Sequence, residues 1–62
     1  MNSDIDRHFI EQMIPYHQMA IMMASMLLSR TEREEMKRLA QDIVRTQTEE
    51  INQMGQWYGE WY

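Results

Sequence analysis

The stretch LLSRTEREEM, residues 27–36, decides the fold, because it separates two long helical patterns by only a few polar residues. The apolar periodicity is interrupted over about residues 29–31, where we expect a turn. Thr31 is followed three residues later by Glu34, which is the spacing of a capping box that satisfies the first free backbone amides of a helix. The spacing therefore predicts a second helix that begins near residue 32.

The first helical pattern runs from about residue 4 to about residue 29. Asn2, Ser3 and Asp4 are residue types that commonly cap a helix N-terminus. Apolar or small residues, with one histidine among them, recur at steps that place them on one face of a helix. These positions are Phe9, Met13, His17, Ala20, Ala24 and Leu27. Because this stripe keeps one register across Pro15, we expect a continuous helix that is kinked at the proline.

The second helical pattern runs from about residue 32 to about residue 58. Its stripe alternates steps of four and three residues, which is the rhythm of a helix that packs along one side. The positions are Met36, Ala40, Ile43, Gln47, Glu50, Met54, Trp57 and Trp61. Gly55 and Gly59 have low helix propensity, so we expect the last turns to fray.

A short turn between two long helices makes them antiparallel neighbours, so the predicted fold is an all-α helical hairpin. The chain has 62 residues and no cysteine, so neither disulfides nor a thiolate metal site can stabilise it. A chain of this size buries only about 60% of the surface that it exposes when unfolded. We therefore expect one domain, residues 1–62, that pairs with a second hairpin into a four-helix bundle, either as a homodimer or within a longer chain.

Composition argues against several functional classes. The net charge is −4, and the six Lys and Arg residues are scattered among ten acidic residues, so there is no basic stripe for nucleic acid. No apolar run approaches the ~20 residues that span a bilayer. The first residues, MNSDIDRHF, lack the features of a signal peptide, which leaves the compartment open. The two histidines lack a neighbouring nucleophile and no Glu-x-x-His motif occurs, so we expect no enzymatic activity.

Polar residues of the two stripes fall at one level of the hairpin. Pairing about a turn near residue 31 makes facing positions sum to about 62 or 63, which places Met13 opposite Glu50 and His17 opposite residue 46 or 47. Polar groups within a helical interface cost free energy unless they find partners. Their meeting at one level therefore indicates a site. The residues at this level are Met13, His17, Gln47, Glu50 and Met54.

Met13 and His17 stand four residues apart and project from one helical face. A thioether and an imidazole form a soft to borderline donor set, which suits copper and above all Cu(I). Zinc prefers more nitrogen or thiolate ligands, and calcium prefers oxygen. The pair therefore predicts a copper site, with Glu50 orienting His17 or accepting a hydrogen bond from it.

A packing interpretation stands beside the copper site. Methionine is a flexible side chain that fills gaps in helical cores, and the chain has eight of them. Packing is the simpler role for Met19, Met22, Met23, Met26 and Met36. A carboxylate partner alone would also explain His17. Under this interpretation the chain is a structural or oligomerisation domain without a metal.

Two segments, DRHFIEQMIPYHQMAIMMA (residues 6–24) and LAQDIVRTQTEEINQMGQW (residues 39–57), resemble the domain-of-unknown-function family 305. Residues that match the first family motif are Asp6, Phe9, Met13, Ile14, Pro15, His17, Ala20, Ile21, Met23 and Ala24. Residues that match the second are Leu39, Ala40, Ile43, Gln47, Glu50, Ile51, Met54 and Trp57.

The resemblance implies a ferritin-like helical bundle, often in exported bacterial proteins, some of which bind copper through methionine and histidine of these motifs. Carried over by position, the candidate ligands are Met13, His17, Met54, Met23 and Glu50. Asp6, Pro15 and Gln47 are candidates for supporting roles, as is Tyr16, which stands where the family pattern has the first of two histidines. The leading hypothesis is a copper-binding domain for metal buffering, tolerance or delivery, in a periplasmic or other extracytoplasmic location.

Overall fold

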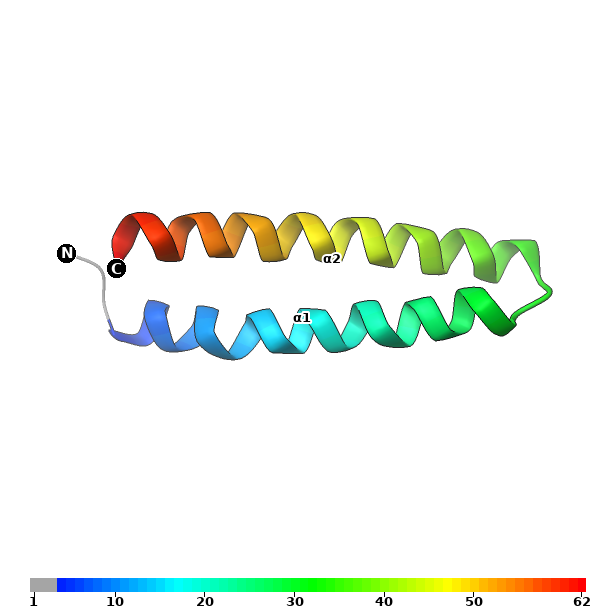
Figure 1. Cartoon of the computed structure of the whole chain (residues 1–62), viewed down its shortest axis with the longest axis horizontal. Helices are drawn as coiled ribbons and strands as arrows, with labels where there is room; N and C mark the ends of the chain where they lie inside the picture. Colours follow the sequence, from blue (N-terminus) through cyan, green and yellow to red (C-terminus); the bar gives the residue numbers. More distant parts are fainter. Residues whose placement is uncertain (1–3) are drawn as a thin grey trace.

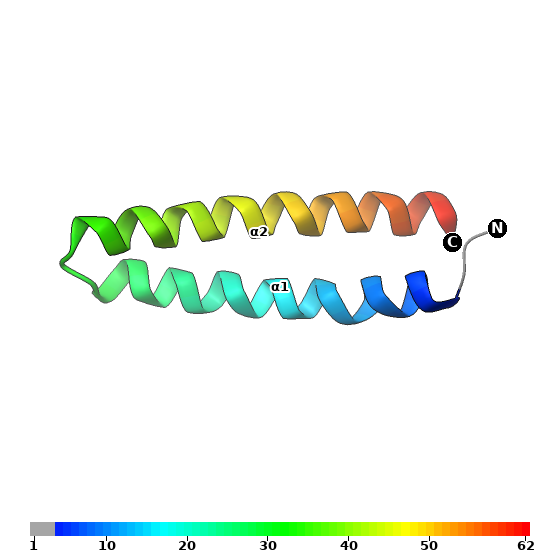
Figure 2. The same ribbon diagram turned by 180° about the vertical axis from the view of Figure 1, so that it is seen from behind.

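The protein is an antiparallel hairpin of two helices, as the sequence predicts. The computed structural model describes residues 4–62, with α1 at Asp4–Arg30 and α2 at Glu34–Trp61. The two helices run side by side over their whole length, so the end of α2 lies beside the start of α1 (Figures 1 and 2). Of the three candidate N-terminal caps, Asn2 and Ser3 lie outside the described residues, and Asp4 is the first residue of α1.

The turn differs from the expected capping box. Thr31 donates its backbone N–H to the carbonyl of Leu27 at 2.9 Å, which closes the last turn of α1. Its hydroxyl accepts the backbone N–H of Arg33 at 3.2 Å, so it orders the loop and does not cap the helix. Arg33 is the N-cap of α2, with extended backbone angles and no side-chain cap bond. The helix therefore starts at Glu34, two residues later than predicted, and Glu34 occupies its first position, where the box cannot close.

Both helices continue without a break through residues that disfavour helix formation. α1 continues across Pro15, as expected from the unbroken stripe. α2 continues across Gly55 and Gly59 to Trp61, beyond the predicted fraying point near residue 58. The rings of Trp57 and Trp61 stack with centroids 5.6 Å apart and planes 3° from parallel. This stacking across one turn adds favourable contact where each glycine costs about 1 kcal/mol of helix propensity.

The interface between the helices is narrow. Five of the described side chains are buried, and they recur mostly at seven-residue steps. They are Ile10, His17 and Ala24 of α1 and Ala40 and Met54 of α2. At the start of α1 the buried residue is therefore Ile10, whereas the expected stripe residue Phe9 is 58% exposed. Trp57 and Trp61, also assigned to the stripe, are 39% and 40% exposed, because they lie to one side of the contact line.

The residue of α1 that the Glu50 side chain contacts is shifted by about one helical turn from its predicted partner. Glu50 was expected opposite Met13, but its carboxylate contacts His17, four residues further along α1. The loop explains part of the shift, because α1 ends at Arg30 and α2 begins only at Glu34.

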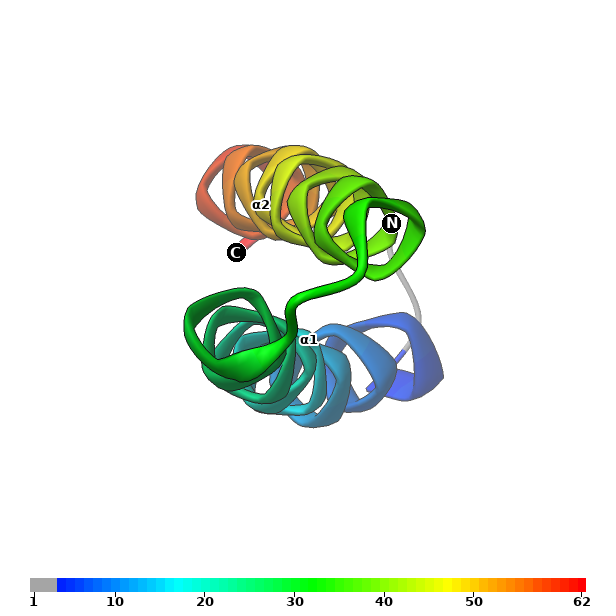
Figure 3. The ribbon, with the colours of Figure 1, turned by 90° about the vertical axis from the view of Figure 1, so that its right-hand side faces the viewer.

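One long face of the hairpin is apolar and uncovered. The hairpin exposes 5061 Å², whereas a compact protein of its mass, 7.6 kDa, exposes about 4,300 Å². Figure 3 looks along the hairpin and shows a single layer of two helices. Grooves along one side are lined by residues that we call the open face. They are Phe9, Met13, Ala20, Met23 and Leu27 of α1, and Ile43, Trp57 and Trp61 of α2.

Candidate metal centre

The imidazole of His17 is the only buried polar side chain among the described residues, and α1 fixes its orientation. Its Nδ1 lies 2.9 Å from the backbone carbonyl of Met13, one turn earlier in the helix. A carbonyl oxygen can only accept a hydrogen bond, so Nδ1 carries the hydrogen. The other ring nitrogen, Nε2, is thereby left to face α2. This is the arrangement found in metal-binding histidines, where a bond at one nitrogen orients the other.

Glu50 meets His17 from the opposite helix. Its Oε2 lies 3.2 Å from Nε2, and 56% of its side chain is exposed. When Nε2 carries a hydrogen, it donates that hydrogen to the carboxylate. When Nε2 carries no hydrogen, its lone pair and the carboxylate oxygen face each other, and both can coordinate the same cation.

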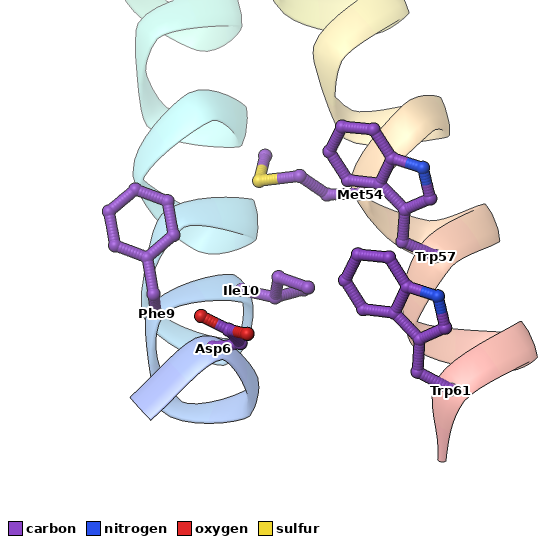
Figure 4. A pocket seen from close by; sticks show the side chains of 6 residues that line it. All are labelled: Asp6, Phe9, Ile10, Met54, Trp57 and Trp61. Atoms are coloured by element: carbon purple, nitrogen blue, oxygen red, sulfur yellow. The ribbon is translucent and has the colours of Figure 1, made fainter. Parts of the chain in front are cut away.

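Two methionines join this pair. Met13, His17, Glu50 and Met54 line one groove between the helices, on the open face. Met54 is buried, and Figure 4 shows its side chain reaching from α2 toward α1, beside Trp57. The groove therefore collects one imidazole, one carboxylate and two thioethers from both helices.

The thioethers are essential to any metal site in this groove. Within residues 4–62, no place gathers three or more side chains from among His, Cys, Asp and Glu. A hard or borderline cation such as calcium or zinc would lack ligands here. The donor set fits a soft ion that accepts thioether sulfur together with one nitrogen, as Cu(I) does.

A family model described as "Domain of unknown function (DUF305)" matches residues 1–62. The chain belongs to this family. The resemblance predicted from the two sequence motifs is confirmed, and most of the groove residues are motif residues.

Among solved structures, CopM in its Cu(II)-bound form is 58% identical over 100% of this chain, with a TM-score of 0.92. CopM in its Cu(I)-bound form is also 58% identical, with a TM-score of 0.91, and the apo form reaches 0.93. A mimivirus relative, "Uncharacterized protein L153" of Acanthamoeba polyphaga mimivirus, is 43% identical over 49 residues. This chain covers 47% of the Cu(II)-bound CopM chain and 32% of the mimivirus protein, so it spans half or less of these relatives.

The remaining candidate ligand, Met23, is not part of the groove of this DUF305 hairpin. It lines another groove of the open face together with Ala20, Leu27 and Ile43. Its position six residues after His17 corresponds to about 9 Å along the helix axis. The structure therefore does not bring Met23 to the imidazole.

The candidate supporting residues are dispersed. Tyr16 is 70% exposed, Pro15 is exposed and Gln47 is half-buried. Asp6 lines a second groove at the open end of the hairpin, beside Ile10 and the stacked tryptophans (Figure 4). Met54 belongs to both grooves, so the end groove adjoins the candidate metal centre.

Gln53 lines the metal groove although the sequence analysis did not select it. The signal for it was its spacing, since it stands three residues after Glu50 and therefore shares a helical face with it. Its amide is a further polar group beside Met54 in the groove.

A polar cluster of Arg7, Glu11 and Tyr58, which no sequence motif indicated, links the open ends of the two helices on a different side of the hairpin. Tyr58 donates its hydroxyl hydrogen to Oε2 of Glu11. Arg7 donates from Nε to the same carboxylate at 3.4 Å and to the Tyr58 hydroxyl at 3.3 Å. The hydrogen bond from Tyr58, followed by the charge of Arg7, holds the pKa of Glu11 below its ordinary value. Hydrophobic periodicity does not mark this cluster, because all three residues lie outside the apolar stripes.

The length and hydropathy of the two described helices can be compared with those of a membrane-spanning segment. Within residues 4–62, neither helix is long and apolar enough to cross a membrane.

Proposed function

We propose that this chain binds copper in the groove between α1 and α2, with Met13, His17 and Met54 as ligands. The observation that carries the proposal is the orientation of His17. Its ring is buried, its Nδ1 is fixed on a backbone carbonyl, and its Nε2 faces a groove that two thioethers line. Copper would be held by one imidazole nitrogen and two soft sulfur atoms from opposite helices, a set that favours Cu(I).

Glu50 has a supporting role in this proposal. Its carboxylate is a hard oxygen donor, which Cu(I) does not favour. Its Oε2 lies 3.2 Å from Nε2, so whenever Nε2 carries a hydrogen the carboxylate accepts it and keeps the ring turned toward the groove. Because most of its side chain is exposed, it can turn away when copper takes its place at Nε2.

The likeness to CopM supports the choice of metal. CopM has been solved with Cu(II), with Cu(I) and with silver bound, and it shares the fold of the hairpin over the whole of this chain. We assign the chain to copper buffering, tolerance or delivery in an extracytoplasmic compartment, and not to catalysis. Within residues 4–62 the groove offers thioethers and one imidazole for holding an ion, and its lining includes no hydroxyl or thiol nucleophile.

The open face would be covered by a second copy of the chain, giving a four-helix bundle with two-fold symmetry. The solved CopM chains are about twice as long as this one, so they have the length for a second hairpin. The open face carries three large aromatic side chains, Phe9, Trp57 and Trp61, each more than a third exposed. Burial of such side chains would supply the apolar contact that the hairpin lacks.

An anaerobic competition titration tests the copper site. Wild type and the double variant Met13→Leu/His17→Leu are titrated with Cu(I) in the presence of a coloured Cu(I) chelator. We expect wild type to remove one equivalent from the chelator at the groove and the double variant to lose that equivalent. Tyr16→Phe is the matched control, because it changes a neighbouring exposed side chain outside the groove. Equal competition by wild type and the double variant would overturn the assignment of these ligands.

The alternative is a structural domain whose polar groups fix the register of the bundle. One observation favours it, because both ring nitrogens of His17 already have partners within the protein. A buried polar pair can select one alignment of helices without any metal. Under this alternative, wild type and the double variant take the same amount of copper from the chelator, and copper changes their thermal stability to the same extent.

A further inference from the structure

Three methionines of α1 have no place in the hairpin contact or in the candidate metal centre. Met19, Met22 and Met26 are 59%, 66% and 52% exposed. At 100° per residue they lie within about 40° of the direction opposite to the buried His17 line. We call Met19, Met22 and Met26 the outer methionines.

A second copy centred on the open face would leave Met22 and Met26 uncovered, with Met19 at its edge, about 40° around the helix from Met23. The open face of α1 is marked by Met13, Ala20 and Leu27, which follow one another at seven-residue steps. The outer methionines lie about 80° or more around the helix from that line. Packing, the role that the sequence suggested for them, is therefore not satisfied by the hairpin or by the proposed bundle.

The surroundings of the outer methionines are unusual for an exposed helix face. Residues 12–29 contain no Asp, Glu, Lys or Arg, whereas the exposed side of a helix is normally charged. Leucine would serve as well as methionine if apolar surface were the only requirement. Methionine adds a polarisable thioether sulfur, which is a soft ligand that carries no proton at any ordinary pH.

The spacing of the outer methionines suits a single ion. The steps from Met19 to Met22 and from Met22 to Met26 are three and four residues, so the three side chains stand on successive turns of one face. Neighbours at these steps have Cβ atoms about 5–6 Å apart. The long, flexible side chains allow three sulfur atoms to approach one ion from these positions.

We propose that Met19, Met22 and Met26 form a second soft-metal site on the outer face of α1, made only of thioethers and selective for Cu(I) or Ag(I). The site needs neither His17 nor a second copy of the chain. It faces solvent, whereas the groove site lies between the helices, so it would exchange its ion more readily. The hairpin would then hold one ion in the groove and present another at its surface.

Ag(I) titration of protein labelled with ¹³C at the methionine methyl groups tests the proposal, because each of the eight methionines contributes one methyl signal that a Met→Leu variant assigns. We expect the methyl signals of the outer methionines to move together and to saturate at one equivalent of Ag(I) for this site. They should move in the same way in Met13→Leu/His17→Leu. The triple variant Met19→Leu/Met22→Leu/Met26→Leu should bind one Ag(I) fewer per chain than wild type.

Met23→Leu is the matched control, because Met23 is 66% exposed on the same helix but turns toward the open face. It should keep the full uptake of Ag(I). The proposal is overturned if the outer signals stay in place while those of Met13 and Met54 move, or if the triple variant binds as much Ag(I) as wild type. If the outer signals move and those of Met13 and Met54 do not, the groove site fails and the outer site stands.

Discussion

The two nitrogens of the buried His17 ring have different roles. Nδ1 is tied to the Met13 carbonyl within α1, whereas Nε2 depends on the exposed carboxylate of Glu50 across the interface. The first bond lies within α1, so it can form whatever the alignment of α1 against α2. The second requires both helices, so the position of Glu50 reports whether the groove is assembled. The ring is therefore oriented by its own helix, and its Nε2 contacts a carboxylate of the other helix.

His17→Leu separates the structural role of the ring from its copper role. In the metal-free protein we expect a change in the free energy of unfolding of at most about 1 kcal/mol, because leucine fills the site and Glu50 keeps its contact with solvent. Wild type should gain more stability with Cu(I) than the variant does, by about 2.7 kcal/mol at one hundred times the dissociation constant of the groove site. Urea unfolding with and without Cu(I) measures both effects. A loss of several kcal/mol without metal would instead assign His17 to the structural role.

The sequence was sufficient to place the groove residues at one level, but not to pair them. Met13 and His17 share a helical face by spacing alone, and any hairpin brings Glu50 and Gln47 near them. These two residues of α2 are one turn apart, so the length of the loop decides which one meets the ring. In the structure Thr31 bonds to Arg33 within the loop instead of capping α2, and the capping-box pattern could not reveal this preference.

At the scale of the helices, periodicity predicted each element but not its exact contact line. Phe9 and Ile10 are adjacent apolar residues, and either could continue the stripe. Ile10 is buried because a single partner helix covers only a narrow line, which leaves Phe9 on the open face. The polar cluster of Arg7, Glu11 and Tyr58 holds the helix ends together at the level of Ile10, and it lies outside any apolar pattern.

Tyr58→Phe tests this clamp between the helix ends. Removing the hydroxyl takes away the main cause that lowers the pKa of Glu11, so that pKa should rise toward its ordinary value. Because the folded-state pKa lies below the ordinary one, the bond contributes stability above the ordinary pKa, and this contribution is lost as the pH falls through the folded-state pKa. The melting temperatures of wild type and variant should therefore differ at neutral pH and converge in acid.

A carboxyl NMR titration of Glu11 measures the pKa directly, and thermal melts from pH 7 to pH 2 measure the convergence. Tyr16→Phe serves as the control, since that ring is 70% exposed and lies about 140° around α1 from Glu11. A difference in melting temperature that stays constant across this range would show that the Tyr58 hydroxyl acts without the Glu11 charge.

The molecule as a whole is long and thin, with extents of 48 × 14 × 12 Å, and this shape limits what one chain can bury. None of the described side chains is large and completely buried. The groove residues lie on the open face, so anything that covers this face also covers the candidate metal centre. Copper binding and assembly are therefore expected to be linked, because a covered groove excludes water from the soft ligands.

Phe9→Glu tests the assembly. In an isolated hairpin, Phe9 is 58% exposed, so the substitution should change stability by no more than about 0.5 kcal/mol. In a four-helix bundle the new carboxylate would be buried without a partner, which strongly disfavours association. Sedimentation equilibrium should give wild type twice the chain mass of 7.6 kDa and the variant the single-chain mass, with helical circular dichroism retained. Gln12→Glu adds the same charge at an exposed position outside the open face and should remain dimeric. A wild type that sediments as a single helical chain would contradict the dimer, and the open face would then remain uncovered beside the copper ligands.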